Sequence, residues 1–416
     1  MTTSARPQAA PGGLLRSPSF LSVWSALTLS AAGDRLFAAA VAWYAIVHLG
    51  ATVGVVAVGL AQFLPIAVMA PFTGVLVDRL PRHWLLAGTD AVRFAVSLAL
   101  CLAFWTGGVS TPLLVIGIVV LRVTGVMFEP ALQSHIGTIA RDEGELLRLD
   151  AWLLASDMIS GMLGPVLAGI AVAAGIQIAL LLNSLTFLIS ALSLLGAWRI
   201  LRDSTPGRSR SLRAAANGWM TAARQGLAAA RQDPAMTRLA PTLPLIDLVE
   251  TGILLILPAL LIDHSAHGGV WYGMLIGAWF TGRLLGLAFA RRFIVHARKG
   301  ILLALNATIQ GSAILAAGLW PSPPWMMLCF LIVGTPSGCA SVCVNAYIQT
   351  RIEENMRGRI FALLGALVAL AMPLGPVISG LVAYVASPAL SLIVLGATLV
   401  VVGLSPLTSR QLWQVP

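Results

Sequence analysis

The chain has 416 residues, of which 58% are apolar and only 10% are charged, and its mean hydropathy is +0.89. Soluble domains have about 25% charged and 45–50% apolar residues, so this composition excludes an ordinary soluble globular protein. The formal net charge of +10 would suggest nucleic acid in a soluble protein, but in a membrane protein the placement of the basic residues matters more than their total.

Twelve apolar segments follow one another along the chain. They cover residues 19–48, 52–77, 84–106, 111–139, 149–173, 177–198, 241–262, 270–290, 300–320, 324–350, 360–385 and 388–408. A helix needs about 20 mostly apolar residues to cross a bilayer, and the short alternating segments of an outer-membrane barrel are absent. The sequence therefore predicts an all-α membrane protein with twelve transmembrane helices.

The spans and their connections define the predicted organisation. Residues 1–18 form a disordered cytoplasmic tail, 19–198 a six-helix half, 199–240 a basic cytoplasmic linker, 241–408 a second six-helix half and 409–416 a second cytoplasmic tail. The first span is long and contains Asp34 and Arg35, which is unlike a cleavable signal peptide.

Basic residues separate to one side of the predicted membrane. If the chain starts inside, the termini, the inner loops and the linker hold every Lys and Arg except Arg35, Arg93, Arg122 and Arg283, and the outer loops hold none. Lys and Arg concentrate on the cytoplasmic side of membrane proteins. We therefore predict that both termini are cytoplasmic, in a multi-pass protein of the plasma membrane, which we expect to be a bacterial inner membrane.

The two halves repeat each other. Residues 164–169 read Gly-Pro-Val-Leu-Ala-Gly and residues 375–380 read Gly-Pro-Val-Ile-Ser-Gly, at an offset of 211. Because six spans separate them, both halves enter from the same side, which is typical of the parallel repeats that flank a cavity in secondary transporters. The linker carries eight arginines. It is predicted either to lie on the anionic inner leaflet as an amphipathic helix or to act as a solvated hinge.

Short motifs resemble those of a known family. Residues 74–82 read Gly-Val-Leu-Val-Asp-Arg-Leu-Pro-Arg, and residues 164–169 are given above. With Gly33-Asp34, Phe128-Glu129-Pro130-Ala131 and Arg357-Gly358-Arg359, these motifs resemble the major facilitator superfamily, in particular the branch of enterobactin exporters and macrolide or multidrug efflux proteins. The sequence departs from that pattern at Pro81, which replaces a glycine, at Arg122, which a glycine follows after three residues rather than four, and at Ala290, which stands where the second half would need an aspartate.

Two of these motifs predict moving parts. We expect Gly74, Asp78, Arg79 and Arg82 to form a gating loop at the cytoplasmic membrane face, with simple topology anchoring as the alternative for the two arginines. Strips of small residues run along the fifth and eleventh spans and permit close helix packing; they comprise Ser160, Gly164, Ala168, Ala371, Gly375 and Ser379, and we group with them Pro165, Gly169, Pro376 and Gly380. The prolines interrupt the helical hydrogen bonds, which predicts either a bend between the halves or plain packing.

Charges inside the spans are the candidates for energy coupling, because each costs about 2.5–3.5 kcal/mol at a helix centre unless it is paired, hydrated or useful. Six acids qualify, namely Asp34, Asp90, Glu129, Asp157, Asp247 and Glu250, and only four arginines oppose them. A carboxylate that lacks a partner in hydrocarbon favours its neutral form, so such groups can exchange protons.

Asp34 is the leading candidate for proton coupling, with Arg122 as its predicted partner and a static ion pair as the alternative. Glu129, Asp247, Glu250 and Arg283 complete the predicted set of functional charges. We expect Asp90 and Arg93 to form a local structural pair, since they lie one turn apart, and we leave Asp157 open between a buried hydrogen-bonded role and a proton role.

The resemblance implies that spans one, four, seven and ten line a cavity. Substrate-lining candidates are Phe37, Phe128, Trp279, Asn345 and Gln349. The aromatic residues favour an amphipathic or aromatic substrate over a sugar or a small ion. The four cysteines lie in spans without a CxxC pair, so we expect no metal site.

The predicted function is secondary active export of a small, amphipathic organic molecule of the drug or siderophore type by alternating access. The energy source is a proton gradient and no cofactor is expected; the partners are the substrate, protons and membrane lipids, without nucleic acid, and the protein is expected to be a monomer. The alternatives are a lysophospholipid flippase or uptake carrier of the same fold and, more remotely, a membrane-embedded enzyme. A His-Glu-x-x-His motif and a nucleotide-binding loop are absent from the sequence.

Overall fold

A computed structural model describes residues 18–79, 81–139, 143–196, 212–232, 234–264, 267–293 and 299–407, with most of their side chains. Helices follow one another along the described chain. The first six are α1 (Pro18–Leu49), α2 (Ala51–Arg79), α3 (Arg82–Trp105), α4 (Thr111–Ile139), α5 (Glu143–Ala174) and α6 (Ile176–Gly196). They are followed by α8 (Leu212–Gln232), α9 (Pro234–His264), α10 (Gly268–Phe293), α11 (Lys299–Leu319), α12 (Pro323–Arg351), α13 (Glu354–Ala371), α14 (Leu374–Val385) and α15 (Pro388–Leu407).

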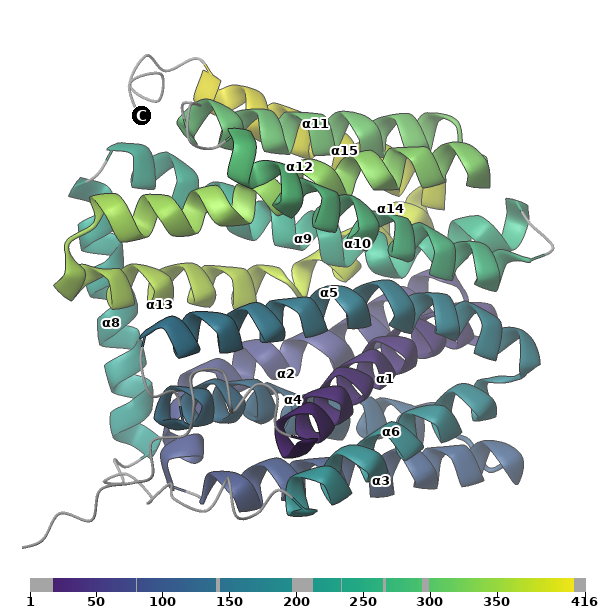
Figure 1. The fold of residues 1–416 in the computed structure, drawn as a ribbon. Helices are drawn as coiled ribbons and strands as arrows, with labels where there is room; N and C mark the ends of the chain where they lie inside the picture. The colour runs from purple at the N-terminus through teal and green to yellow at the C-terminus, as the bar shows by residue number, and fades with distance from the viewer. Residues whose placement is uncertain are drawn as a thin grey trace, which may run out of the picture.

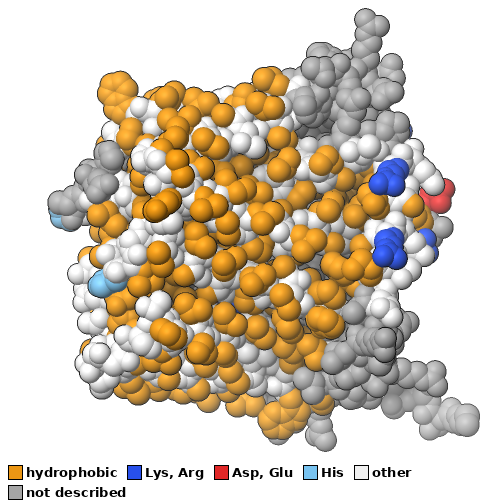
Figure 2. Space-filling model, turned by 180° about the vertical axis from the view of Figure 1, so that it is seen from behind, with side chains coloured by type: hydrophobic (Ala, Val, Ile, Leu, Met, Phe, Trp, Pro, Cys, Tyr) orange, Lys and Arg blue, Asp and Glu red, His pale blue; other side chains and the backbone are white. Residues whose placement is uncertain are grey.

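Each of the twelve expected spans has its helix among the described residues, and the eleventh is divided between α13 and α14. Nine helices of the described residues are long and apolar enough to cross a membrane, among them α2, α4 and α12. One side face of the molecule is covered by apolar side chains, while the coloured Lys and Arg side chains gather at one end of it (Figure 2). This is the surface expected of a protein embedded in a bilayer.

The helices pack as two groups, α1 to α6 and α9 to α15, which lie one above the other in Figure 1. Within the first group α1 packs on α5 and α6, and α3 on α4 and α6; within the second, α10 packs on α12, and α11 on α12 and α15. Between the groups the larger contacts are those of α5 with α10 and of α2 with α14. The α8 helix lies at one end of the bundle and contacts α2, α9 and α13.

The structure differs from the predicted spans at three places. The α5 and α9 helices begin at Glu143 and Pro234, before the expected starts at residues 149 and 241. A charged segment extends α5, whereas the added turns of α9 bury Met236 and Ala240 in a cluster with residues of α12 and α13. The eleventh span, expected to be one helix over 360–385, breaks between α13 and α14 at Met372 and Pro373.

The break in the eleventh span has a local cause, and a residue of α9 hydrogen-bonds to the carbonyl that it frees. Pro376 has no backbone N–H, so it cannot donate to the carbonyl of Met372 four residues before it. The hydroxyl of Thr251 lies 2.9 Å from that carbonyl oxygen and donates to it, although it also lies 3.0 Å from the carbonyls of Asp247 and Leu248 in its own helix. Thr251 therefore satisfies a carbonyl that a buried proline would leave without a donor.

Glycines allow α10 and α12 to pack with their backbones in contact. A Cβ atom on Gly282 or Gly286 of α10 would collide with the carbonyls of Leu331 and Thr335, respectively. Gly334 and Gly338 of α12 meet the α10 backbone in the same way. Small residues at such spacing are the usual means of close helix packing in membranes, where helices gain no hydrophobic free energy by associating.

We predict that Gly286→Ala destabilises the protein more than Gly365→Ala does. Alanine favours a helix by about 1 kcal/mol over glycine at either position. A Cβ on Gly286 meets the Thr335 backbone, whereas a Cβ on the exposed Gly365 of α13 meets nothing within 4 Å. Overpacking of this kind costs about 1–3 kcal/mol. Melting temperatures in detergent test this, and equal values for the two variants would refute the close packing.

Candidate functional site

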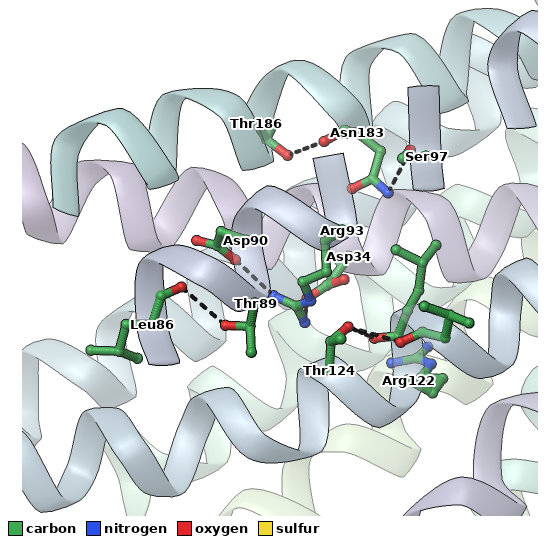
Figure 3. Close-up of polar contacts among 12 residues, drawn as sticks. Asp34, Leu86, Thr89, Asp90, Arg93, Ser97, Arg122, Thr124, Asn183 and Thr186 are labelled. Atoms are coloured by element: carbon green, nitrogen blue, oxygen red, sulfur yellow. Dashed lines mark hydrogen bonds and ion pairs between the residues drawn. The ribbon is translucent and has the colours of Figure 1, made fainter. Parts of the chain in front are cut away.

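A single buried arginine joins the charges of the first helix group. Arg93 of α3 donates from Nη2 to Oδ2 of Asp34 on α1 at 2.7 Å, and from Nη1 to Oδ1 of Asp90 on α3 at 3.2 Å. Figure 3 shows the guanidinium between the two carboxylates. The arginine therefore links two helices through one charge.

The neighbouring helices enclose this guanidinium. The carbon at its centre lies 4.8 Å from the ring centre of Phe187 on α6 and 5.5 Å from that of Phe128 on α4. A Cβ on Gly125 of α4 would lie 2.6 Å from the Arg93 Nη2 atom. A cation over aromatic faces is favourable, so α3, α4, α6 and α1 all contribute to holding the Arg93 side chain.

The two carboxylates differ in access to solvent. The Asp90 side chain is 0% exposed, while that of Asp34 is 25% exposed. Asp90 Oδ2 and Arg93 Nε are buried without a hydrogen-bond partner among the described residues. The two carboxylates thus share the Arg93 cation.

In this structure Asp34 does not form the predicted ion pair with Arg122, although Arg122 lies within electrostatic range of it. Asp34 pairs with Arg93, because the Arg93 guanidinium serves two acids at once. Arg122 of α4 instead donates to Oε1 of Gln62 on α2 at 3.1 Å, and the Gln62 amide donates to the Ala38 carbonyl of α1 at 3.4 Å. The prediction that Asp90 and Arg93 pair locally is confirmed, but their pair also includes α1.

Arg35 points to another partner. It forms an ion pair with Asp157 of α5, and its guanidinium lies over the Phe280 ring of α10, 4.8 Å from the ring centre. Asp157, which the sequence left open, is therefore an ion-pair partner in the first helix group. Because Phe280 belongs to the second group, this pair lies at the contact between the groups.

The second group has its own set of charges on α9 and α10. Asp247 and Glu250 are partly buried and lie three residues apart on α9. Arg283 of α10 lies within electrostatic range of both. Within the described part of the chain, no ion pair joins these three residues. This arrangement brings together residues that the sequence assigned to separate spans.

The other predicted residues have varied positions. Phe37 is only 2% exposed and lies in the core, which contradicts a lining role in this conformation, because α1 turns that face toward other helices. Trp279 packs against Phe330 and Phe280. Asn345 and Gln349 are exposed on α12, and the Asn345 amide donates to a carbonyl of its own helix. Gly74 is exposed with open space around it.

The side chains of five predicted residues lie outside the description: Asp78, Arg79, Arg82, Glu129 and Arg291. Residues 1–17 and 409–416 of the predicted tails and residues 199–211 of the linker are also outside it. Groups of three or more His, Cys, Asp or Glu that could bind a metal do not occur among the residues described. The Cys339 thiol donates to the carbonyl of Gly286 at 3.1 Å, which is a packing contact.

The small-residue strip of α5 contacts two helices, α1 and α10, which the sequence analysis did not distinguish. Gly164 faces α1, where a Cβ would lie 2.7 Å from the Ala32 carbonyl oxygen, and the neighbouring Ser160 and Ala168 are buried. Pro165 and Gly169 face α10, where their backbones contact Gly273 and Gly269, respectively. Gly269, Gly273 and Gly277 recur every fourth residue, a spacing from which a packing face on this helix could have been predicted.

The strip of the eleventh span repeats this arrangement. Gly375 faces α9, where it packs against the backbone of Leu248 and Gly252, and the neighbouring Ser379 is buried. Pro376 contacts Gly59 of α2, and a Cβ on Gly380 would lie 2.8 Å from a methyl group of Val56. In both repeats the glycine, Gly164 or Gly375, packs against a helix of its own group. The following proline, Pro165 or Pro376, contacts a helix of the other group.

The sequence matches a model of a known protein family over most of its length. A family model described as the Major Facilitator Superfamily matches residues 23–376. The chain belongs to this superfamily. It is therefore a membrane transporter and not an enzyme, and the predictions of a helical major facilitator fold and of a multi-pass protein of the bacterial inner membrane are confirmed, while the cytoplasmic position of the termini stays a prediction.

Among its relatives, macrolide efflux protein A of Streptococcus pyogenes is 24% identical over 374 residues, which cover 88% of this chain and 89% of the relative. Multidrug efflux pump Tap of Mycolicibacterium fortuitum is 27% identical over 384 residues, with 88% and 89% coverage.

Solved structures show the same fold at low identity. A bacterial homologue of the human lysosomal transporter Spinster, in an inward-facing and unoccupied conformation, has a TM-score of 0.67 at 15% identity, covering 96% of this chain and 94% of its own. A POT family transporter in complex with a thioalcohol-conjugated peptide has a TM-score of 0.69 at 12% identity, with 92% and 95% coverage.

We predict that Arg93→Gln strongly destabilises this transporter and that Asp90→Asn partly restores it. Removing one partner of a buried ion pair costs about 3–5 kcal/mol, because the remaining charge is left unpaired. Asp90→Asn removes that charge, so the double variant should melt at a higher temperature than Arg93→Gln alone. Arg351→Gln, which changes an exposed arginine at the end of α12, serves as the control. A double variant that melts lower still would contradict a direct Asp90–Arg93 interaction.

Proposed function

We propose that this protein exports a small amphipathic organic molecule of the drug type in exchange for protons. The observation that carries the proposal is the partly exposed carboxylate of Asp34, which shares Arg93 with the fully buried Asp90. Because both acids bind the same cation, a change at one of them acts on the ion pair of the other. Asp34 is also the member of the cluster that solvent reaches.

The position of Asp34 on α1 couples its charge to movement of the two groups. The next residue, Arg35, pairs with Asp157 of α5 and rests on Phe280 of α10, so a shift of α1 acts directly on the contact between the groups. Asp34 thus lies one residue from a contact that must change when the groups rock. In the proposed cycle, the deprotonated form is held by Arg93, and protonation releases α1 from α3.

Glycine contacts supply the surface on which the groups move. The contacts of α5 with α10 run from Gly161 to Gly169, toward the end of α5 that the predicted topology places outside. Pro165 and Gly169 meet α10 through backbone atoms, whereas Gly161 meets the Phe280 ring, so few flexible side chains need to rearrange when this surface opens and closes. The state described here, with these outer ends packed together, is the one that we expect to accept substrate from the cytoplasm.

The substrate class rests on the relatives and on the aromatic side chains near the charges. The relatives are named for macrolide and multidrug efflux. Phe128 and Phe280 each lie against an arginine of the proposed coupling region. An apolar ring beside a charge suits an amphipathic molecule, which presents both kinds of surface.

Asp34→Asn should abolish accumulation against a gradient and preserve exchange. The purified protein is reconstituted in liposomes, and transport of a radiolabelled macrolide is measured with and without a pH gradient. Asparagine keeps the size of the side chain but cannot exchange a proton, so we expect uphill transport to fall at least tenfold while downhill exchange persists. Arg351→Gln is the control.

Each outcome of this experiment is informative. If Asp34→Asn pumps as well as the parent, Asp34 is not the coupling residue and Asp247 or Glu250 becomes the candidate. Uphill uptake by the parent into the compartment that faces its cytoplasmic side would identify a carrier of the opposite direction. Transport of a labelled lysophospholipid, but not of the macrolide, would identify a lipid flippase.

Gly273→Leu should stop transport without removing the protein from the membrane. A Cβ added to Gly273 would collide with the Pro165 carbonyl, so the larger side chain of leucine would hold α5 and α10 apart at their outer ends. Gly196→Leu, at an exposed end of α6 with open space around it, is the matched control. Transport at the parent rate by Gly273→Leu, at an equal protein level, would show that this contact need not close.

A further inference from the structure

The α8 helix lies across one end of the bundle (Figure 1). It runs roughly perpendicular to the spans in Figure 1. One side of it packs against the protein: Gly226 meets the Arg359 carbonyl of α13, and Ala230 lies in a cluster with Leu363 and Leu364. The α8 helix contacts α2 of the first group and α9 and α13 of the second, so it is packed against both groups of spans.

The free side of α8 has an ordered stripe of four residues. Met220, Arg224, Leu227 and Arg231 follow one another at intervals of four, three and four residues, which places them on one side of a helix. All four are exposed, Met220 to 47% and Leu227 to 40%. Within the described part of the chain, neither arginine forms an ion pair. The stripe therefore alternates long apolar side chains with unpaired positive charges.

We propose that this stripe binds anionic phospholipid of the inner leaflet. A helix that lies in the plane of a membrane surface buries apolar side chains at the headgroup boundary and pairs its basic residues with lipid phosphates. Arginine suits this role, because its guanidinium donates two parallel hydrogen bonds to a phosphate. The complementary charge of the partner and the position of α8 at the basic end of the bundle select a lipid over a protein partner.

Lipid bound there would act on both groups of spans at once. Because α8 contacts α2 and α13, a helix held at the membrane surface holds the inner ends of these two spans at one depth. The proposal does not depend on the substrate or on proton exchange, so it is tested without a transport assay.

The experiment measures lipid binding by the full-length protein in a neutral detergent. Phosphatidylglycerol or phosphatidylcholine is titrated in, and the melting temperature is recorded, since a ligand that binds the folded state raises it. We expect phosphatidylglycerol to raise the melting temperature and phosphatidylcholine to have a much smaller effect. At about one tenfold step per 1.4 kcal/mol and about 1 kcal/mol per arginine, Arg224→Gln/Arg231→Gln should need roughly 30-fold more lipid.

Two matched variants separate charge from position. Arg224→Lys/Arg231→Lys keeps the charge and should respond within about threefold of the parent. Gln225→Ala/Gln232→Ala changes exposed residues about 100° around the helix from the stripe and should respond as the parent does. Glycerol 3-phosphate, which has the phosphate without acyl chains, should give no comparable shift.

The proposal is overturned if the parent gains no more from phosphatidylglycerol than from phosphatidylcholine. It is also overturned if the double Gln variant responds at the same lipid concentration as the parent. If the double variant does not fold, Arg224→Gln and Arg231→Gln are measured singly, and each should need roughly fivefold more lipid than the parent.

Discussion

The structure of the first helix group depends on one buried arginine that two carboxylates share. An isolated charge at the centre of a membrane helix costs about 2.5–3.5 kcal/mol, and here each of the two carboxylates is paired with the one guanidinium. Since Asp34 comes from α1 and the other two from α3, this pairing also fixes how these helices lie. The rings of Phe128 and Phe187 then complete the enclosure.

The contact between the two groups depends on close packing of small residues rather than on ion pairs. There the helices meet through glycine and proline backbones and very few charges, and the main exception is the Arg35 cation on Phe280. Charge pairs hold the first group together from within, whereas small residues make much of its contact with the second. The same division recurs in the eleventh span, where Gly375 packs on its own group and Pro376 faces α2.

Much of the fold was predictable from apolar runs, because the bilayer requires a span length that no other environment imposes. The repeat of Gly-Pro motifs also predicted two equivalent strips. The partner of Asp34 was not predictable. Arg93 lies one turn from Asp90, and sequence spacing gives no sign that the second nitrogen of the same guanidinium reaches another helix.

Two other features show the same limit. The break at Met372 and Pro373 depends on Thr251, which is more than 100 residues away in the sequence and supplies a donor to the freed carbonyl. The glycines of α10 were predictable in principle, since Gly269, Gly273 and Gly277 have the spacing of a packing face. What spacing could not supply was the identity of the helix that each face meets.

The central claim is that the charge of Asp34 controls how the two groups of spans lie. It is tested most directly by the distance between spin labels at Arg148 of α5 and Ala288 of α10, in a background without the four native cysteines. If the claim is correct, acidification shortens this distance in the parent, and Asp34→Asn has the shorter distance at every pH. An Asp34→Asn protein that responds to pH as the parent does would contradict it.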